Sequence, residues 1–478
     1  MLMDLYRRLP GSFQTLAAGI RGYQLQRRRY GKETDALVAQ ALERDFWDAA
    51  RWKRYREERL AFVLHHAATR VPFYRDQWAR RRRDGDRASW EVLANWPILS
   101  KNAVRETPRA FVADGADRQY ETSTSGTTAT PLRLFQSRET LVAWYALFEA
   151  RIRRWNGVNL RDRWAHLGGQ RVIPGPRTKP PYWVWNPGMN QLYVSTYHIR
   201  LDAAEAYLEA LRRYRIRYLF GYASALFALA GAVRERGLQA PSMAVVFSNA
   251  EAFYPFQREL ISEVFQCPVR DTWGQAEIVS GGSECASGTM HFWPEVGETE
   301  WLRNGVDEPV GAGESGRMIS TGFLNLGMPL IRYDGGDRST LAAPGVSCAC
   351  GRGLPIIRSL DGRQADIILT PDGVPVGGLD LIFHPGIPMR EGQIIQESLL
   401  RFRVKVVPSS GFAPRHSEEM SRGLRNILGD RVEVVVETVD SIPRTAAGKF
   451  VIQISLLKDR GRVAAYPEKS REFARSDG

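Results

Sequence analysis

The chain has 478 residues, of which 44% are hydrophobic, 10% aromatic and 25% charged. This profile excludes a disordered tail, a fibre and a disulfide-stabilised miniprotein, and the length allows two or three domains, or one large α/β domain with a small one. Sixty-six Lys and Arg against fifty-three Asp and Glu give a net charge of +13, which is compatible with nucleic acid, an anionic membrane or a phosphorylated small molecule as partner.

Basic residues concentrate near the N-terminus, with the densest runs at 27–29 and 80–83. Such runs are typical of a solvated helix face, so we expect no nucleic-acid partner and at most a peripheral membrane contact there. Four cysteines are too few for a disulfide framework, Cys267 is expected in the core, and no eighteen consecutive apolar residues occur. We therefore expect a protein of the reducing cytoplasm, without a cleaved leader or a membrane span.

The predicted elements of the N-terminal part are helices. Residues 34–66 have apolar positions at helical spacing, a pattern that Val71-Pro72 ends, and helices are expected as far as about residue 110. From residue 121 onward, short apolar runs alternate with helical patterns: strand 132–135 and helix 139–155, strand 218–222 and helix 223–233, strand 243–247 and helix 255–265. This alternation predicts a large layered α/β domain.

A second, smaller domain is expected toward the C-terminus. The sequence there predicts a hairpin around 371–373, a strand at 401–407, a helix at 417–428 and a strand at 431–436, which together suffice for a small α+β domain. Gly and charged residues interrupt the apolar pattern at Asp361-Gly362-Arg363. We therefore divide the chain into domains 1–362 and 363–478.

The most informative motif is the Ser/Thr-rich segment 122–131, just before a predicted strand. Seven hydroxyl side chains surround Gly126, so a tight loop could offer hydroxyl and backbone N–H donors to phosphate oxygens. The GxxxxGK[ST] spacing of a Walker loop is absent. Taken alone, the segment is more often a Ser/Thr-rich linker.

Five further motifs follow in order along the chain. They are Ser-Asn-Ala-Glu at 248–251, Asp-Thr-Trp-Gly-Gln-Ala-Glu at 271–277, Arg-Tyr-Asp-Gly-Gly-Asp at 332–337, Asp-Gly-Arg-Gln-Ala-Asp at 361–366 and Pro-Arg-Thr-Ala-Ala-Gly-Lys at 443–449. Together with the early stretches 71–75 and 96–101, this ordered set resembles the adenylate-forming superfamily of acyl-CoA synthetases. The resemblance spans most of the chain and is greatest to the branch of phenylacetate-CoA ligases and CapK-like proteins of capsular-polysaccharide biosynthesis.

The resemblance implies the adenylate-forming fold, in which a large N-terminal domain holds ATP and a carboxylic acid and a small C-terminal domain acts as a mobile lid. It implies that the carboxylate attacks the α-phosphate of ATP to give an acyl-adenylate and pyrophosphate, with Mg²⁺ offsetting the phosphate charge. An acceptor, commonly the thiol of coenzyme A, then takes the acyl group. The expected activity is that of an acid–thiol ligase.

The same resemblance implies a role for each matching residue. Lys449 would contact the carboxylate and the α-phosphate during adenylation, and Glu277 would bind Mg²⁺. Asp337, assisted by Arg363, would bind the ribose hydroxyls. The remaining expected nucleotide-binding residues form the phosphate loop, the adenine and acyl pockets and their aromatic wall: Ser125, Gly126, Thr127, Thr128, Asn249, Ala250, Glu251, Asp271, Trp273, Gly274 and Gln275.

The sequence departs from the family's pattern in three places. Ala129-Thr130 stand where many relatives have Gly-Lys, so the phosphate loop lacks a lysine. Ala276 replaces the usual Thr or Ser before the metal-binding Glu, and Ala365 occupies a hinge position that is commonly acidic. The departure at the hinge puts the second half-reaction in doubt.

A separate set of metal-ligand types is formed by Cys285, His291, Cys348 and Cys350. Three sulfurs and one imidazole complete a tetrahedral set for structural zinc, and Gly351 permits a tight turn beside the Cys-x-Cys pair. The spacing is not that of a common zinc finger, so unrelated thiols explain it equally well. Some members of the resembled branch carry similar Cys and His positions, which favours the zinc hypothesis.

The acid, its acceptor and the oligomeric state stay open. Aromatic clusters at 182–185 and 218–222 could wall an acyl pocket, but aromatic residues on a buried strand are more often core. Besides coenzyme A, an amine on a sugar or small metabolite could accept the acyl group, and the three departures also fit a non-catalytic nucleotide-binding protein. Nucleic-acid binding rests on the net charge alone.

Overall fold

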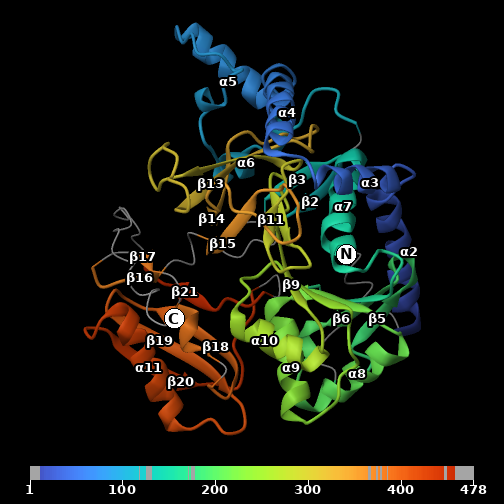
Figure 1. Ribbon diagram of the computed structural model, residues 1–478, viewed down its shortest axis with the longest axis vertical. Coiled ribbons are helices and arrows are strands. Elements are labelled where there is room, and N and C mark those ends of the chain that lie inside the picture. Colours follow the sequence, from blue (N-terminus) through green and yellow to red (C-terminus); the bar gives the residue numbers. More distant parts are fainter. Residues whose placement is uncertain are drawn as a thin grey trace. The chain divides into compact units, whose positions relative to one another are not determined.

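The computed structural model describes residues 11–117, 119–124, 132–170, 172–173, 178–363, 368–372, 375–376, 379–384, 386–445 and 449–457 (Figure 1). Within these residues the chain divides into two compact units. Unit 1 comprises the described parts of Met1–Leu302, Pro309–Leu360 and Arg444–Phe450, and unit 2 those of Arg303–Glu308, Asp361–Pro443 and Val451–Gly478. A large α/β assembly and a smaller α+β assembly are therefore present, as expected.

Helices form the N-terminal part of unit 1. They are α2 (Gly11–Arg29), α3 (Thr34–Arg44), α4 (Ala49–Arg70), α5 (Pro72–Arg83) and α6 (Lys101–Glu106). The pattern expected over 34–66 is divided, because Asp48 starts a new helix by accepting a hydrogen bond from the backbone N–H of Arg51 at 2.7 Å. Val71-Pro72 ends α4 and at once begins α5, since proline suits the first helical turn. None of the described helices is long and apolar enough to cross a bilayer.

A mixed sheet of thirteen strands organises unit 1, in the order β12-β13-β14-β15-β11-β10-β9-β8-β7-β4-β6-β5, with β1 paired to β14. The strands are β1 (Leu99–Ser100), β4 (Trp164–Gly168), β5 (Trp183–Asn186), β6 (Gln191–Ser195), β7 (Tyr218–Tyr222), β8 (Val245–Asn249), β9 (Val269–Gly274), β10 (Gly281–Glu284), β11 (Met290–Phe292), β12 (Gly297–Leu302), β13 (Ser315–Gly322), β14 (Tyr333–Leu341) and β15 (Ile356–Arg363). The run β9-β8-β7-β4-β6 is parallel, whereas β9-β10-β11 and β12-β13-β14 pair antiparallel.

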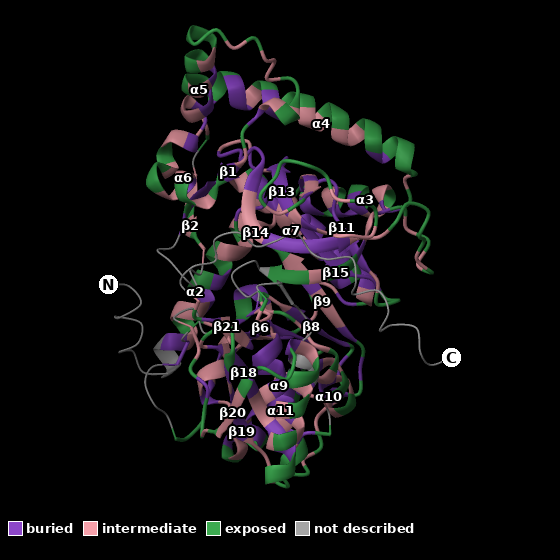
Figure 2. Cartoon of the chain, turned by 90° about the vertical axis from the view of Figure 1, so that its left-hand side faces the viewer, coloured by how far each residue is buried: buried purple, intermediate pink, exposed green. Residues whose placement is uncertain are grey.

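Helices cover both faces of the parallel part of this sheet (Figure 2). On one face, α8 (Ala204–Arg213), α9 (Ala223–Glu235) and α10 (Pro255–Phe265) pack over Leu219 and Val246, which have no exposed surface. On the other face, α3 and α7 (Arg138–Phe148), continued by a π-helical turn over Glu149–Arg153, pack against Tyr218, Phe220 and Phe247. Burial on both faces explains why these strands are continuous apolar runs in the sequence.

Most expected elements of unit 1 are confirmed, with small shifts of their ends. The strand expected at 132–135 is β3 (Arg133–Gln136), which pairs with β2 (Tyr120–Ser123) in a separate small sheet rather than in the main one. Short 3₁₀ turns connect the longer elements: Leu93–Asn95, Pro108–Phe111, Arg154–Asn156, Pro187–Met189, Thr196–His198 and Leu201–Ala203 in unit 1, and Leu379–Ile382 in unit 2.

Unit 2 is built on a four-stranded sheet in the order β20-β19-β18-β21. Its elements are β16 (Ile368–Leu369), β17 (Pro375–Val376), β18 (Met389–Gln396), β19 (Arg401–Pro408), α11 (Pro414–Leu428), β20 (Glu433–Thr438) and β21 (Gln453–Ser455). Phe402 and Val404 of β19 and Met420 and Leu424 of α11 have no exposed surface and form its core. The hairpin, the two strands and the helix expected here are confirmed; β18 and β21 are additional.

Candidate active site

The carboxyl ends of the parallel strands β7, β8 and β9 meet at one edge of the sheet of unit 1. In the register of these strands, Tyr222 is paired with Asn249 and Ser248 with Asp271. Ligands of open α/β sheets bind at this edge, beyond the carboxyl ends of the strands. The motifs at 248–251 and 271–277 therefore lie where a nucleotide site is expected.

The loop after β8 combines a buried acceptor with a strained backbone. The side-chain Oδ1 of Asn249 is buried and has no hydrogen-bond partner among the described residues. Ala250 has a φ of +63°, in the left-handed region that a residue with a Cβ adopts at a cost of roughly 1–2 kcal/mol. Both features are typical of a loop shaped for a ligand, because a buried acceptor without a protein partner is satisfied by what enters the site.

Glu251 connects this loop to two other segments of unit 1. Its Oε2 accepts a hydrogen bond from the backbone N–H of Ser224 at 2.9 Å, and its Oε1 accepts one from the backbone N–H of Phe450 at 2.6 Å. Burial raises the pKa of Glu251, and the two N–H donors oppose the rise. The chain segment that carries Lys449 is thereby attached beside the loop after β8.

Asp271, near the start of β9, is engaged within the protein. Its Oδ1 accepts hydrogen bonds from the hydroxyl of Ser248 and the backbone N–H of Thr272, both at 2.9 Å, and its own N–H donates to Glu284 at 2.8 Å. Burial and the neighbouring carboxylate of Glu284 raise the pKa of Asp271 to about 7. These contacts join β8, β9 and β10, and the nucleotide-binding role of Asp271 stays a prediction.

The end of β9 is connected to β14. The amide nitrogen of Gln275 donates a hydrogen bond to Oδ2 of Asp337 at 2.6 Å. Gly335 leaves room for this amide, because a Cβ at this position would fall 2.6 Å from the same nitrogen and displace it. Gly274 lies against the ring of Trp144 of α7, and Trp273 packs against a small apolar cluster that includes Met290, Phe292, Met318 and Ile357. Two motifs far apart in the sequence are thus in direct contact.

Glu277 is held by two donors from different parts of unit 1. Its side chain is 5% exposed, and its Oε1 accepts a hydrogen bond from the hydroxyl of Tyr333 at 2.7 Å and lies 3.3 Å from Nζ of Lys101. Lys101 reaches it because β1 pairs in parallel with β14, which sets Leu99 opposite Tyr333. Burial and the charge of Glu277 raise the pKa of Tyr333, so its hydroxyl remains a donor. A carboxylate oxygen of this kind is a hard ligand that suits Mg²⁺.

Sequence reasoning missed Lys101 and Tyr333 as partners of Glu277. Both residues lie in stretches that were recognised as motifs, 96–101 and 332–337, but no chemical role followed from their spacing. At Ala276, where a hydroxyl is expected, the backbone carbonyl instead accepts a hydrogen bond from the amide nitrogen of Gln136 at 2.8 Å.

Other predicted positions lie outside the described residues. These are the phosphate-loop residues Ser125, Gly126, Thr127 and Thr128, the departure Ala129-Thr130 and the hinge residue Ala365. Arg363 ends β15, and only its backbone is described. For Lys449, the backbone N–H donates to the hydroxyl of Thr445 at 3.1 Å, and its carbonyl accepts from the N–H of Thr445 at 2.9 Å. Their nucleotide-binding and catalytic roles stay predictions.

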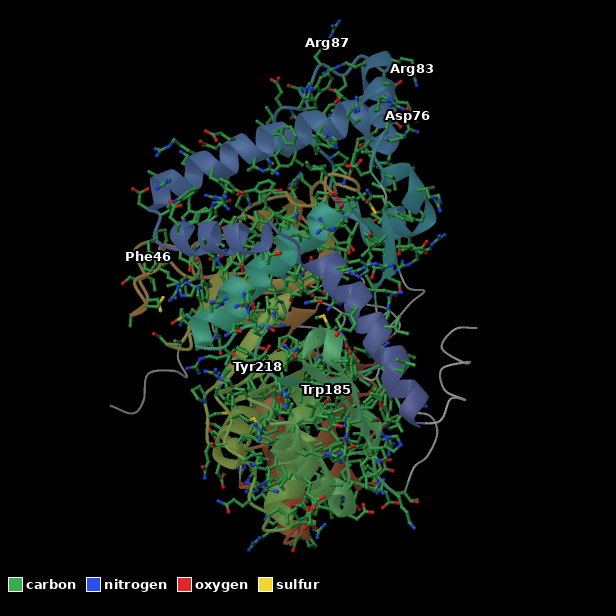
Figure 3. All side chains as sticks on the ribbon, turned by 90° about the vertical axis from the view of Figure 1, so that its right-hand side faces the viewer. Phe46, Asp76, Arg83, Arg87, Trp185 and Tyr218 are labelled. Carbon is green, nitrogen blue, oxygen red and sulfur yellow. The ribbon has the colours of Figure 1, made fainter. Side chains whose placement is uncertain are left out.

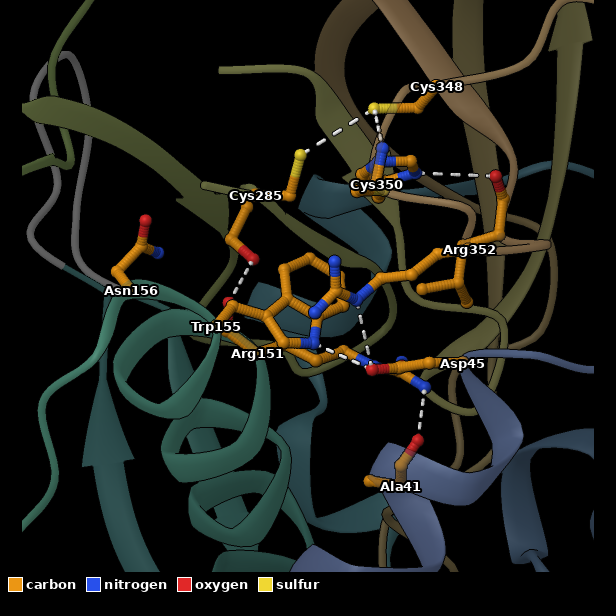
Figure 4. Close-up of polar contacts among 12 residues, drawn as sticks. Ala41, Asp45, Arg151, Trp155, Asn156, Cys285, Cys348, Cys350 and Arg352 are labelled. Carbon is orange, nitrogen blue, oxygen red and sulfur yellow. Dashed lines mark hydrogen bonds and ion pairs between the residues drawn. The ribbon is translucent and has the colours of Figure 1, made fainter. Parts of the chain in front are cut away.

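The four predicted zinc ligands converge, and Figure 4 shows the three cysteines among them. The ligand atoms of Cys285, His291, Cys348 and Cys350 all lie within 4.8 Å of one another. Sγ of Cys285 is 3.7 Å from Sγ of Cys348, and Sγ of Cys350 is 3.4 Å from Nε2 of His291. Gly351, at a φ of +71°, turns the chain directly after the Cys-x-Cys pair. Three sulfurs and one imidazole at this separation fit a tetrahedral zinc ion.

The residues around this cluster favour the tautomer of His291 and the thiolate form of Cys348 that bind a metal ion. Nδ1 of His291 lies 3.4 Å from the carbonyl oxygen of Leu354, so an Nδ1–H donated there leaves Nε2 as an acceptor toward the sulfurs. Burial acts to raise the pKa of Cys348, but hydrogen bonds with Thr289, Cys350 and His291 outweigh it and lower that pKa to about 6. The thiolate that results is the form that binds a metal ion.

Cys267 lies in the core, as expected, and burial raises its pKa to about 12.

A buried ionic network adjoins the cysteine cluster (Figure 4). Nε of Arg352 lies 3.3 Å from Oδ2 of Asp45, and its guanidinium lies 4.5 Å from the ring of Trp155. Asp45 also accepts a hydrogen bond from the indole N–H of Trp155 at 2.6 Å and pairs at 3.0 Å with Arg151, which pairs in turn with Glu295 at 2.7 Å. The turn that carries two of the cysteines is therefore connected to the C-terminal end of α3 and to the π-helical turn after α7.

The aromatic clusters divide between the core and the ligand edge of the sheet. Tyr182 and Tyr218 are 2% and 1% exposed and belong to the core, whereas Trp183 and Trp185 are half-buried beside α8. Tyr222 ends β7 opposite Asn249.

The basic runs are partly engaged. The guanidinium groups of Arg28 and Arg29 lie over Tyr120 and Tyr145, each 4.3 Å from the ring centroid. Figure 3 shows Arg83 and Arg87 at the outer end of the helical pair α4 and α5, directed away from the protein. A peripheral membrane contact stays a prediction.

Comparisons with known proteins agree with this geometry. Residues 370–455 match the family described as the CapK C-terminal domain. The chain is 21% identical to protein CapK of Staphylococcus aureus over 473 residues, covering 96% of this chain and 100% of that protein. It is 22% identical over 351 residues to phenylacetate-coenzyme A ligase of Pseudomonas putida, covering 70% of this chain and 76% of that enzyme. A solved 2-hydroxyisobutyryl-CoA ligase in complex with 2-HIB-AMP is similar with a TM-score of 0.67 and 19% identity, covering 86% of this chain and 91% of that chain. The expected fold is thereby confirmed.

Proposed function

We propose that the chain, which is similar to protein CapK and to phenylacetate-coenzyme A ligase, activates a carboxylic acid with ATP and transfers the acyl group to the thiol of coenzyme A. The observation that carries this proposal is the junction of two distant motifs, in which Gln275 contacts Asp337 and Tyr333 contacts Glu277. An acidic ribose ligand and an acidic metal ligand beside each other are what a nucleotide site requires. In the first half-reaction, a carboxylate oxygen bonds to the α-phosphorus as the bond to pyrophosphate breaks.

Each residue near this junction has a task in the proposed reaction. Asp337, oriented by Gln275, would accept hydrogen bonds from the ribose hydroxyls. The unpartnered Oδ1 of Asn249 would accept one from the exocyclic amino group of adenine. Lys449, attached beside the loop after β8 through its neighbour Phe450, would supply positive charge as the carboxylate and the α-phosphate meet.

Glu277 would hold Mg²⁺ in this scheme. Its oxygen atoms are the hard ligands that this ion prefers, and the contacts with Tyr333 and Lys101 fix the side chain. When bound there, Mg²⁺ offsets the charge of the phosphates. Lys101 would act as a positioning residue that holds the Glu277 carboxylate in place when the metal ion is absent.

The adenylation step is tested by carboxylate-dependent exchange of pyrophosphate into ATP over a panel of acids. We expect exchange with at least one acid, and we expect Lys449→Ala to abolish it. Lys53→Ala is the matched control, because Lys53 is 70% exposed on α4 and pairs with Glu57 one turn away. Exchange that persists in Lys449→Ala would contradict the role of Lys449, and ATP binding without exchange for any acid would favour a non-catalytic protein.

The acceptor is proposed from similarity and needs its own test. A solved 2-hydroxyisobutyryl-CoA ligase with a TM-score of 0.52 is described in complex with 2-HIB-AMP and CoA in the thioesterification state, which supports a thiol rather than an amine. Incubation with ATP and the activated acid, followed by mass analysis of the products with coenzyme A or with amino sugars and small amines, distinguishes the two. A thioester supports the proposal, and an amide would replace it by the amine alternative.

We further propose that Cys285, His291, Cys348 and Cys350 hold a structural zinc ion. The support is the closeness of the four ligand atoms and the second hydrogen bond of His291, and the ion would fasten the turn before β15 to the hairpin of β10 and β11. Metal analysis of protein purified without added metal should find stoichiometric zinc that is lost in Cys348→Ser and kept in Cys267→Ser. A metal-free, fully stable protein would contradict this role.

A further inference from the structure

A second buried acceptor without a partner lies on β4. Nδ1 of His166 is buried and has no hydrogen-bond partner among the described residues. Its imidazole is surrounded by aromatic rings, with centroids at 4.9 Å for Tyr193, 5.8 Å for Trp164 and 6.0 Å for Phe220. Gly168 is required beside it, because a Cβ at that position would fall 2.3 Å from Nε2. The protein thus accommodates a polar ring in an aromatic environment and leaves one of its nitrogens unused.

The other polar groups of this region have protein partners. The hydroxyl of Tyr197 donates to the carbonyl of Gly169 at 2.8 Å, and Tyr222 bonds to the backbone of the same residue. Tyr193 bonds to the backbone of Gln170. Since the three tyrosine hydroxyls are engaged by the loop after β4, His166 is the side chain of this group that keeps an unused acceptor.

The place of His166 in the sheet relates it to the proposed nucleotide site. In the parallel register, His166 lies opposite Phe220 of β7, which lies opposite Phe247 of β8, two residues before Asn249. Neighbouring strands are about 4.8 Å apart, so His166 is about 10 Å across the sheet from β8. The nucleotide motifs come from β8 and β9, and the acyl group of a bound adenylate that extends over β7 would approach β4.

The protonation state of His166 determines what it can recognise. Burial and, to a smaller extent, the nearby charge of Arg29 lower the pKa of His166 to about 4, against the opposing effect of a hydrogen bond with the backbone of Phe220. The ring is therefore neutral at physiological pH. A neutral imidazole has one N–H and one acceptor, and a ring that donates to a backbone carbonyl through one nitrogen presents the other as an acceptor.

We propose that His166 determines the substrate specificity of the acyl site, and that the acid carries a hydroxyl or amino group which donates a hydrogen bond to Nδ1 of His166. The aromatic rings around the imidazole suit a flat or compact apolar body between this group and the carboxylate. This inference rests on the proposed function, because it names the class of acid for the same site. A site built to bond a substrate hydroxyl discriminates strongly against the analogue that lacks it, since its own acceptor is then left buried and unpaired.

The test uses matched pairs of acids that differ in one donor. Hydroxy- and amino-substituted aromatic and short branched acids are compared with their hydrogen, fluoro and methoxy analogues in the pyrophosphate-exchange assay on the full chain. We expect the donor-bearing member of at least one pair to be preferred by about 10- to 100-fold in kcat/KM. In His166→Phe that preference should fall to about unity, with the KM for ATP unchanged, and in His166→Gln, which restores an acceptor, part of it should return.

His198→Phe is the matched control, because the Nδ1 of this buried histidine is already paired with the hydroxyl of Ser195 at 2.7 Å. The preference should survive in this variant even if its stability falls. Acids that are activated by the parent protein without any donor preference would overturn this inference and leave the proposed function intact, as would a preference that persists in His166→Phe. Absence of exchange with every acid would overturn the proposed function and this inference with it. The comparison of acids on the parent protein decides the question even if His166→Phe fails to fold.

Discussion

Replacement of Arg151 by Met is the perturbation whose cost the structure specifies best. The Arg151 side chain has no exposed surface; it makes two 2.7 Å hydrogen bonds to Glu295 and one of 3.0 Å to Asp45. Met keeps most of the apolar volume but leaves the buried carboxylate of Glu295 without its cation, and leaves Asp45 with Arg352, 3.3 Å away, as its remaining cation among the described residues. Breaking a buried ion pair in this way costs about 3–5 kcal/mol, because the remaining charge is neither solvated nor paired. The hydrogen bond from Trp155 to Asp45 remains and keeps the loss within this range.

Thermal unfolding of the parent and the Arg151→Met variant measures the loss. Folded domains gain about 2 cal/mol/K of entropy per residue on unfolding. For unit 1, a loss of 1 kcal/mol in unfolding free energy therefore lowers the unfolding temperature by about 1.3 °C, and the variant should unfold about 4–7 °C below the parent near neutral pH. Burial already raises the pKa of Asp45, and Arg151 opposes that rise, so its removal raises the pKa further. The folded variant then holds protons that the unfolded chain releases, and its deficit should shrink as the pH falls toward about 5.

The control is the exposed pair of Arg75 and Asp114, whose side chains are 46% and 52% exposed. Arg75→Met should leave the unfolding free energy almost unchanged, because water screens such a pair. A negligible deficit in Arg151→Met, or a large deficit that does not depend on pH, would refute the reasoning that Arg151 compensates the charge of these buried carboxylates.

Three further changes test the candidate site. Lys101→Met should lower several-fold the Mg²⁺ concentration that half-saturates pyrophosphate exchange, because the ammonium competes with the ion for Glu277; a Mg²⁺ titration measures this. Gly335→Ala should raise the KM for ATP about 10-fold in steady-state kinetics, because its Cβ would displace the Gln275 amide from its carboxylate partner. Folded Asp271 keeps a proton up to its pKa of about 7, whereas the unfolded side chain loses its proton near pH 4, so the parent loses stability as the pH rises from about 4 to 7. Asn does not titrate, so Asp271→Asn should gain stability relative to the parent over this pH range in unfolding measurements.

Matched variants accompany these three tests. Lys53→Met removes an exposed ammonium from α4 and should leave the Mg²⁺ requirement unchanged. Gly231→Ala introduces a methyl group in α9 where nothing lies within 4 Å, and should leave the KM for ATP unchanged. Asp372→Asn alters a carboxylate that is 75% exposed and should leave the pH dependence of stability unchanged. If a site variant behaves like its control, the role proposed for the contact that the variant removes is wrong.

Sequence patterns were sufficient where local chemistry decides the structure. β7 and α10 have the expected ends, because a continuous apolar run and a proline at the first helical turn mark them. β10 was not expected, because its buried sequence Gly-Gly-Ser-Glu has no apolar signal and it is a strand only through its neighbours β9 and β11. The π-helical turn after α7 was not expected either; its Arg151 and Arg153 make buried ion pairs with Asp45, Glu295 and Glu149.

The candidate site shows the same division between local and long-range information. The zinc ligands were predicted from residue type, whereas their closeness results from the pairing of β11 with both β10 and β15. The contact between Lys101 and Glu277 could not be predicted, because it requires the pairing of β1 with β14. The unpartnered Nδ1 of His166 could not be predicted either, because it depends on which partners the neighbouring hydroxyl groups have in the folded protein.

The ion pair of Asp45 with Arg352 joins residues that are 307 positions apart. A ribosome must therefore synthesise most of the chain before the end of α3 meets its final partner, and the same holds for β1, which waits for β14. Contacts of such sequence separation slow folding and prolong the time during which apolar surface is exposed. We expect nascent chains that stop before Arg352 to remain dependent on chaperones, whereas unit 2, with its short-range pairing of β18 and β19, can mature soon after it emerges.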